Sequence, residues 1–422
     1  MIPPVSLQEI LQPSRIAAAW EKLRSNDGAA GEDSVTIREL EEPLPHVWPS
    51  IEESIRSGSY QPSPLWPVQI PKPAGGTRKL AIPSVIDRLV QHAITGAITP
   101  RWESRFPRCS YAYRQGVGTC AAINGVLSAS AIIKGPVALR MDIRDFFDRI
   151  PPEAISSVLR MTPCDEDSCR LIERSVHAPL ATPLGPVSSA MGIPQGSPLS
   201  PLLSNAVLLP FDLSFSSAPA SLFRYADDML VLCRDEATAR VMLNQASEVL
   251  AGIGLELNAN KTRIAPLDQT SFLGFGFVQE DGRWHRGLSD ETRAACVMHL
   301  RRMEYSGKSP AEMVTFLRQW AAYFLPSAED RIRHGAFVRE LCSSFRLNEP
   351  DISQSSRSSP PPGFSYSGGS SAGGSYPRLP WALRFMMRRI RFGLNFQRRG
   401  GFMPVPTGFH VTIAGHRIHI RL

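Results

Sequence analysis

Alternating apolar and polar positions predict short strands in the middle of the chain, and helical spacing predicts most of the elements around them. Residues 137–143 alternate with the period of a strand that ends near Asp142. Apolar runs at residues 222–223 and 229–232 flank Tyr225-Ala226-Asp227-Asp228, a pattern that predicts two short buried strands with the acids at their turn. Helices are expected over residues 14–25, 40–55, 87–98, 119–133, 151–161, 165–176, 235–251, 290–304, 310–324 and 328–345. Strands mixed with helices in this order favour an α+β fold.

Turn-forming residues mark the borders of these elements. The proline-rich segment 61–73 leads into an expected hairpin that turns at Gly75-Gly76, and a second hairpin is expected ahead of Gly192. Residues 351–380 are rich in Ser, Gly and Pro, which predicts a flexible linker. Residues 410–420 alternate around a turn and predict a β-hairpin near the carboxyl end.

Cysteine spacing and hydropathy narrow the class of protein. The seven cysteines are scattered, with no C-x-x-C pair and no histidine cluster at zinc-binding spacing. Reduced thiols in a cytoplasmic protein are therefore expected. No apolar run approaches the roughly 20 residues that a membrane span needs, so no membrane partner is expected.

Three carboxylates carry the candidate chemistry. Asp227 and Asp228 lie at a turn between buried strands, and Asp142 ends another strand. Buried acids need a compensating cation, and hard oxygen ligands suit Mg²⁺ or Mn²⁺. Two-metal phosphoryl transfer uses carboxylates that bridge two ions about 3.5–4 Å apart. The alternative is a solvated pair of turn aspartates, because turns favour Asp.

Several motifs resemble, in their order, those of the reverse transcriptases, and within them the bacterial group II intron-like branch. Residues 141–147 resemble the first metal motif, residues 192–201 (Gly-Ile-Pro-Gln-Gly-Ser-Pro-Leu-Ser-Pro) the Gln-Gly loop, and residues 224–228 the Tyr-x-Asp-Asp hairpin. Residues 254–262 are similar to the family's lysine motif, and residues 272–275 to its primer grip. Upstream, the segments that resemble the fingers motifs are residues 70–73, 78–83, 87–91 and 110–114. The resemblance covers residues 15–345.

The resemblance implies ligands for two Mg²⁺ ions, with Mn²⁺ as a substitute. Asp142, Asp227 and Asp228 are the expected ligands, with the Ile143 carbonyl as a further oxygen. Lys261 matches the candidate general acid for the pyrophosphate, although a lysine at a strand end is more often a surface residue. These residues would form the catalytic centre.

The resemblance also implies a site for the incoming dNTP, to which Ile143 would belong as well. Phe147 matches the aromatic residue beneath the sugar that clashes with a 2′-hydroxyl; the alternative is a core residue. Gln195 matches the residue beside the nucleotide. Lys72 and Arg78 match the cations that clamp the triphosphate, and either one could instead be a solvated hairpin charge. Lys79 could exchange roles with Arg78.

Positive charge is concentrated near the carboxyl end. Lys and Arg exceed Asp and Glu by seven over the whole chain (46 against 39), and the last 42 residues hold eight arginines and no acid. Interleaved aromatic residues add stacking surfaces, and the combination predicts RNA binding. A tail that packs on the preceding helices is the alternative. The expected nucleic-acid contacts are Gly274 in the primer grip and, in the tail, Arg384, Arg388, Arg389, Arg391, Arg398 and Arg399.

Together the expectations describe a right-hand polymerase. Its parts would be an N-terminal extension (1–60), fingers (61–135, with 151–200 contributing), a palm (136–285), a helical thumb (286–347), a linker (348–380) and an Arg-rich tail (381–422). Expected partners are an RNA template, a structured noncoding RNA, a DNA primer or product and dNTPs. Antiphage defence is one expected role; an intron-encoded maturase or an RNA-binding splicing factor is the alternative. The oligomeric state stays open.

Overall fold

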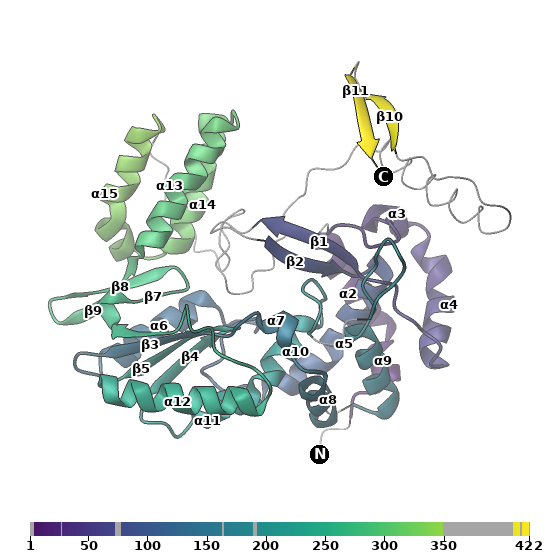
Figure 1. The fold of residues 1–422 in the computed structure, drawn as a ribbon, viewed down its shortest axis with the longest axis horizontal. Helices are drawn as coiled ribbons and strands as arrows, with labels where there is room; N and C mark the ends of the chain where they lie inside the picture. The colour runs from purple at the N-terminus through teal and green to yellow at the C-terminus, as the bar shows by residue number, and fades with distance from the viewer. Residues whose placement is uncertain are drawn as a thin grey trace. The chain divides into compact units, whose positions relative to one another are not determined.

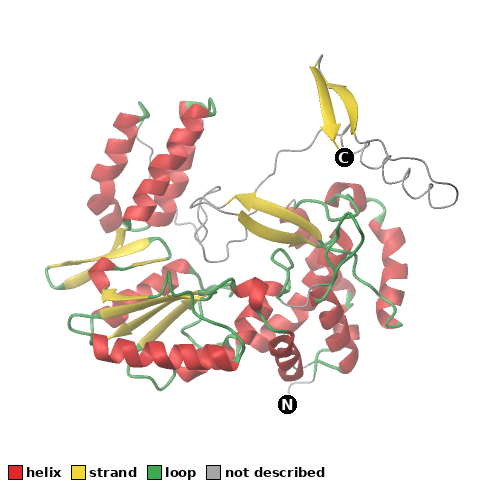
Figure 2. Cartoon of the chain, viewed as in Figure 1, coloured by secondary structure: helices red, strands yellow, loops and turns green. Residues whose placement is uncertain are grey.

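The structure is a computed structural model that describes residues 4–26, 28–71, 77–162, 164–188, 192–348, 408–413 and 416–421, the last two ranges as backbone. Helices and antiparallel strands alternate along the chain (Figures 1 and 2), so the predicted mixed class is confirmed. Residues 4–348 lie in one compact unit, and the hairpin after residue 407 lies in a second.

Helices dominate the first hundred residues. They are α1 (Leu7–Ile10), α2 (Pro13–Asn26), α3 (Ile37–Glu41), α4 (Leu44–Arg56) and α5 (Val85–Glu103). Helix α2 packs against α5 through Ile16 and Leu23. The single helix predicted over residues 40–55 is wrong at its start, because Pro43 and Pro45 lack the N–H groups that a continuous helix requires there.

The hairpin predicted after residue 61 is confirmed. Strands β1 (Trp66–Pro71) and β2 (Thr77–Ile82) pair in register from Trp66–Ile82 to Pro71–Thr77. The Gly75-Gly76 turn lies outside the described residues. Of the second expected hairpin, ahead of Gly192, the described residues show one antiparallel bridge, between Leu180 and Val187.

A four-stranded antiparallel sheet forms the centre of the unit. Its strand order is β4-β5-β3-β6, from β3 (Val137–Asp142), β4 (Ser221–Tyr225), β5 (Asp228–Cys233) and β6 (Arg263–Pro266). Alternation divides β3 between two cores: Leu139 and Met141 belong to one, and Ala138 to the other. Arg140 and Asp142 therefore share the face of Ala138.

Helices cover both faces of this sheet (Figure 1). Helix α12 (Glu236–Gly252), capped by Asp235 as predicted, packs Met242 and Leu250 against the face of Met141. Helix α6 (Thr119–Ser130) packs Ile123 and Val126 against the other face. The remaining helices between residues 146 and 214 are α7 (Phe146–Arg149), α8 (Pro152–Met161), α9 (Glu166–Val176), α10 (Ser200–Val207) and α11 (Leu209–Ser214).

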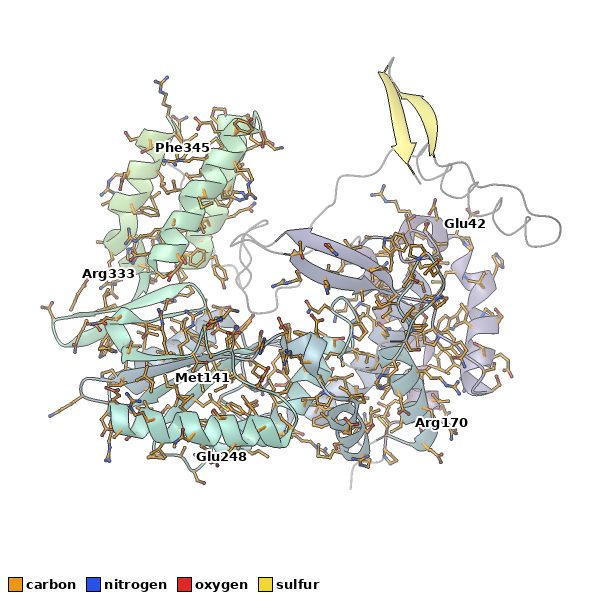
Figure 3. The ribbon with its side chains drawn as sticks, in the orientation of Figure 1. Glu42, Met141, Arg170, Glu248, Arg333 and Phe345 are labelled. Atoms are coloured by element: carbon orange, nitrogen blue, oxygen red, sulfur yellow. The ribbon has the colours of Figure 1, made fainter. Side chains whose placement is uncertain are left out.

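A second sheet joins the central sheet to three long helices. After the short 3₁₀ turn η1 (Leu267–Gln269) come β7 (Ser271–Phe272), β8 (Phe275–Glu280) and β9 (Arg283–Leu288), and then α13 (Asp290–Tyr305), α14 (Pro310–Phe324) and α15 (Ala328–Ser344). The three predicted helices are confirmed, and each begins after a capping serine. Phe275 packs against Phe324. Arg333 of α15, labelled in Figure 3, forms an ion pair with Glu280 of β8 at 2.8 Å.

The predicted carboxyl-end hairpin is confirmed at the level of the backbone. Strands β10 (Gly408–Ile413) and β11 (His416–Arg421) pair antiparallel, with Gly408 opposite Arg421. The six tail arginines expected to contact RNA, and the linker 351–380, lie outside the described residues.

Two expectations from composition can be compared with the structure. All seven cysteines are described, and each is a free thiol. In the part of the chain that the structure describes, no helix is both long and apolar enough to cross a membrane.

Candidate active site

The central sheet brings the three predicted carboxylates together. Asp142, at the end of β3, lies directly opposite Asp228, the first residue of β5. Tyr225 also pairs with Asp228, which leaves Ala226 and Asp227 as a two-residue turn. Ala226 has φ of +59°, in the left-handed region that Ala rarely adopts. The turn thus holds Asp227 beside the facing pair.

Burial disfavours the ionised form of these carboxylates. Burial raises the pKa of Asp227 to about 7, and the nearby charges of Asp142 and Asp228 also raise it. Burial also raises the pKa of Asp228, although the Arg140 guanidinium opposes that shift. Three acids so close together require cations to remain ionised.

Two side chains of the chain supply positive charge. Lys261 Nζ lies 2.9 Å from Asp142 Oδ2. Arg140 Nη2 lies 3.5 Å from Asp228 Oδ2, and its Nη1 donates a hydrogen bond to Ser271 Oγ at 2.9 Å. Lys261 is thus placed at the carboxylates as predicted. Arg140 was not predicted, although a lone charge on a half-buried strand was the available signal.

The carboxylates fit divalent ions in their chemistry. Asp227 Oδ1 and Asp228 Oδ1 are buried and have no hydrogen-bond partner among the described residues. Such oxygens are the ligands that Mg²⁺ prefers. As the side chains stand, no three acid, His or Cys groups in the described ranges converge on one point. Asp142 and Asp228 each form an ion pair with a cation of the chain, Lys261 and Arg140 respectively.

The loop 192–201 lies beside the first metal motif. Gly192 N donates to the Ile150 carbonyl at 2.9 Å, and Ile193 N donates to the Phe147 carbonyl at 2.8 Å. A Cβ on Gly192 would lie 2.7 Å from that Phe147 oxygen, so the close approach requires glycine. On its other side, the Gln195 carbonyl accepts a hydrogen bond from Ala81 N at 2.8 Å. Backbone hydrogen bonds of the loop therefore link β2 to α7, which contains Phe147.

Gln195 contacts Asp148, the residue that follows Phe147. Phe146 is buried, whereas Phe147 is partly exposed and meets it edge-on with ring centres 5.3 Å apart. Gln195 Nε2 donates to Asp148 Oδ1 at 3.3 Å. Phe146 is thus the core residue of the aromatic pair.

The predicted phosphate clamp is described in part. Lys72 lies outside the described residues. Arg78 is half-buried on β2, and Lys79 is exposed on the opposite face. Burial raises the pKa of the Tyr113 hydroxyl, the Asp227 charge raises it further, and the Arg78 charge lowers it. The charges of Asp227 and Arg78 thus both act on Tyr113, which was not among the predicted site residues.

The remaining predicted residues border this site. Ile143 N donates to the Asp227 carbonyl at 3.4 Å. Leu273 and Gly274 connect β7 to β8 and both have positive φ, the signature of a type I′ hairpin turn. The Gly274 carbonyl accepts a hydrogen bond from Thr292 Oγ1 at 2.6 Å, which attaches this turn to α13.

Comparison with known proteins relates this region to one protein family. The model for "Reverse transcriptase (RNA-dependent DNA polymerase)" matches residues 70–277, a range that contains all three carboxylates and the loop. Protein YkfC of Escherichia coli K12 is 28% identical over 319 residues, which cover 66% of this chain and 84% of YkfC. Residues 70–277 thus form a reverse transcriptase domain, and the chain is similar to YkfC over most of its length.

Other relatives come from introns and retrons. The group II intron-encoded protein LtrA of Lactococcus lactis is 26% identical over 48% of this chain and 34% of LtrA. The retron Mx162 reverse transcriptase of Myxococcus xanthus is 25% identical over 46% of this chain and 43% of that protein. The chain therefore spans most of YkfC but less than half of these two relatives.

Proposed function

We propose that this protein extends a primer on an RNA template by two-metal nucleotidyl transfer. The observation that carries the proposal is the register of the sheet, which sets Asp142 opposite Asp228 and holds Asp227 in the turn beside them. Two buried oxygens without partners among the described residues support it further. A protein that only binds RNA has no need of such a costly cluster of acids.

The carboxylates are the proposed ligands of two Mg²⁺ ions, with Mn²⁺ as a substitute. Bound ions would activate the primer 3′-hydroxyl and stabilise charge on the leaving pyrophosphate. Asp142, Asp227 and Asp228 would hold them, with the Ile143 carbonyl as a further oxygen. Lys261 would turn from Asp142 toward the pyrophosphate and supply a proton there as general acid.

The loop 192–201 and β2 are the proposed nucleotide site. Phe147, the partly exposed member of the aromatic pair, would exclude a 2′-hydroxyl by steric clash. Gln195 would contact the sugar and phosphate, with its side chain oriented by Asp148. Arg78 on β2, together with Lys72, would neutralise the triphosphate.

The proposed enzyme would have the parts of a right-hand polymerase. The β1–β2 hairpin with α5 would form fingers, the central sheet with α6 and α12 the palm, and α13, α14 and α15 the thumb. Gly274 would grip the primer from the turn between the two sheets. The tail arginines Arg384, Arg388, Arg389, Arg391, Arg398 and Arg399 would bind RNA.

Replacing Asp227 and Asp228 with Ala tests the chemistry. The double variant should fold and lose dNTP incorporation on an RNA template with a DNA primer. A matched control removes two adjacent exposed acids, as Glu166→Ala/Asp167→Ala at the start of α9, and should keep full activity. A folded Asp227→Ala/Asp228→Ala protein that polymerises like the parent contradicts the proposal.

The biological role we propose is synthesis on a dedicated noncoding RNA, in antiphage defence. A retron reverse transcriptase among the relatives favours a stand-alone enzyme, whereas the intron-encoded relatives favour a maturase or splicing factor. Sequencing RNA and DNA that copurify with the protein separates the two. Intron RNA in place of a dedicated noncoding RNA would exclude the defence role.

A further inference from the structure

A fully buried ion pair lies beneath the catalytic turn. Arg224 on β4 and Asp212 on α11 both have 0% of their side chains exposed. Two parallel hydrogen bonds join them, from Arg224 Nε to Asp212 Oδ1 and from Nη2 to Oδ2, each 2.5 Å long. Neither Arg224 nor Asp212 has a role in the mechanism proposed above.

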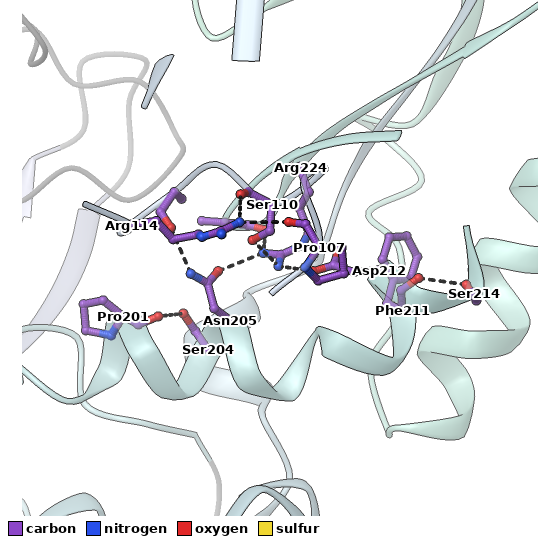
Figure 4. A network of polar contacts seen from close by, with 12 residues as sticks. Pro107, Ser110, Arg114, Pro201, Ser204, Asn205, Phe211, Asp212, Ser214 and Arg224 are labelled. Carbon is purple, nitrogen blue, oxygen red and sulfur yellow. Dashed lines mark hydrogen bonds and ion pairs between the residues drawn. The ribbon is translucent and has the colours of Figure 1, made fainter. Parts of the chain in front are cut away.

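The guanidinium of Arg224 has three further partners, one of which belongs to the catalytic turn. Nη1 donates to the Ala226 carbonyl at 3.2 Å and to Asn205 Oδ1 on α10 at 3.0 Å. Nη2 donates to Ser110 Oγ at 2.7 Å. Figure 4 shows these side chains converging from α10, α11, β4 and the segment before α6.

Backbone contacts align the segment 109–112 with the same strand. Arg224 N donates to the Cys109 carbonyl at 2.7 Å, and Tyr111 N donates to the Arg224 carbonyl at 2.9 Å. Asn205 Nδ2 donates to the Ala112 carbonyl at 2.9 Å. The next residue, Tyr113, has φ of +60° and lies within the electrostatic reach of Asp227.

Stability alone does not explain such a pair. Replacing a buried ion pair with apolar side chains of similar volume is often neutral or stabilising. Geometry is what the catalytic turn requires, because Ala226 is held in a left-handed conformation that costs energy. The hydrogen bond to its carbonyl restrains the residue that precedes Asp227.

We propose that Arg224 and Asp212 are positioning residues for nucleotidyl transfer. Through the Ala226 carbonyl, Arg224 fixes the turn that presents Asp227, and through Ser110 and Asn205 it aligns the segment that ends at Tyr113 with this turn. Asp212 holds the guanidinium in the required orientation. The inference rests on the proposed function, because it assigns Asp227 to the catalytic centre.

The test removes the pair without leaving a buried charge. Arg224→Met/Asp212→Leu should fold and bind primer–template as the parent does. Its kcat for dNTP incorporation should fall about 10²-fold with little change in KM, because small displacements of reacting groups have effects of this size. Its affinity for Mn²⁺, measured by electron paramagnetic resonance without substrate, should fall 10- to 100-fold, as is typical when a partner of a ligand is lost.

Two further variants keep the test decisive. Asn205→Ala retains the ion pair but removes one acceptor of Arg224 and the contact with Ala112. It should therefore lower kcat and Mn²⁺ affinity, but by less than the double variant does. If the double variant does not fold, the Asn205→Ala result decides. The control Arg101→Met/Glu9→Leu removes another two-bonded ion pair, between α5 and α1, and should leave both quantities unchanged.

The outcomes separate this inference from the proposed function. Folded variants of Arg224 and Asn205 with the kcat and Mn²⁺ affinity of the parent would show that the pair is structural. Asp227→Ala/Asp228→Ala is measured in parallel. If that protein is inactive while the Arg224 variants are active, only the positioning role is lost; if it also polymerises, the proposed function is lost and the positioning role with it.

Discussion

Replacing Asp227 with Asn is expected to stabilise the metal-free protein at alkaline pH. In the folded protein, burial and then the charge of Asp142 raise the pKa of Asp227 from 3.8 to about 7. At pH values between 3.8 and about 7, Asp227 holds a proton in the folded protein that it has already released in the unfolded chain. Stability linked to this group is therefore fully present below pH 3.8 and is lost as the pH rises through 7.

The size of the effect follows from this window. Each unit of pKa shift corresponds to about 1.4 kcal/mol, so the roughly three-unit shift opposes folding by about 4 kcal/mol at pH 8. At pH 5, which lies only part of the way from 3.8 to 7, the loss of unfolding free energy is about 2 kcal/mol. Asn does not ionise. The Asp227→Asn protein should exceed the parent in unfolding free energy by these amounts.

Urea unfolding in EDTA at pH 8 and pH 5 measures both values. The control is Asp235→Asn, at the cap of α12, where the Thr238 backbone N–H lowers the pKa of the carboxyl. Asn caps a helix about as well as Asp, so this variant should gain nothing at pH 8. A gain for Asp227→Asn that is absent, or that does not shrink at pH 5, would refute the reasoning. If Mg²⁺ binds as proposed, adding it should stabilise the parent more than the variant.

Three further outcomes are expected. Phe147→Val should raise the use of rNTPs relative to dNTPs, whereas Phe146→Val should lower stability without moving that ratio; an unchanged ratio in an active Phe147→Val enzyme would make Phe147 a core residue only. Gly192→Ala should lower the thermal stability by more than Gly58→Ala does, because both glycines have positive φ but only Gly192 approaches another backbone oxygen; equal losses would remove the argument from close approach. Deleting residues 381–422 should weaken RNA binding and flatten its log–log salt dependence by about 0.7 per lost phosphate contact on single strands, while short-template extension is retained; an identical slope would show that the tail makes no phosphate contacts.

Local pattern was sufficient to predict the strands that hold the acids. Asp142 and Asp228 each end or begin a run of strongly apolar, strand-forming residues, and a two-residue turn between β4 and β5 leaves little freedom in their register. The long helices were predictable for the same reason. Their apolar spacing is accompanied by capping residues such as Asp235 and Ser309.

Contacts between distant segments were not predictable from one sequence. Arg224 and Asp212 lie on different elements, and nothing local shows that both become buried and face each other. Tyr113 reaches the vicinity of Asp227 only because the segment before α6 pairs with β4. Lys261 was predicted at the centre by resemblance, but its ion pair with Asp142 depends on the path of the chain between α12 and β6.

The contacts of the loop 192–201 have a consequence for how selectivity could change. The hydrogen bonds that attach this loop to Ile150, Phe147 and Ala81 all use backbone atoms. If the nucleotide site is as proposed, substituting Gln195 or Phe147 would change the side chains that a nucleotide meets without breaking these backbone hydrogen bonds to β2 and α7. If Phe147 discriminates between sugars as proposed, that discrimination would be separable from the scaffold, and single substitutions would change the nucleotide preference while the framework stays the same.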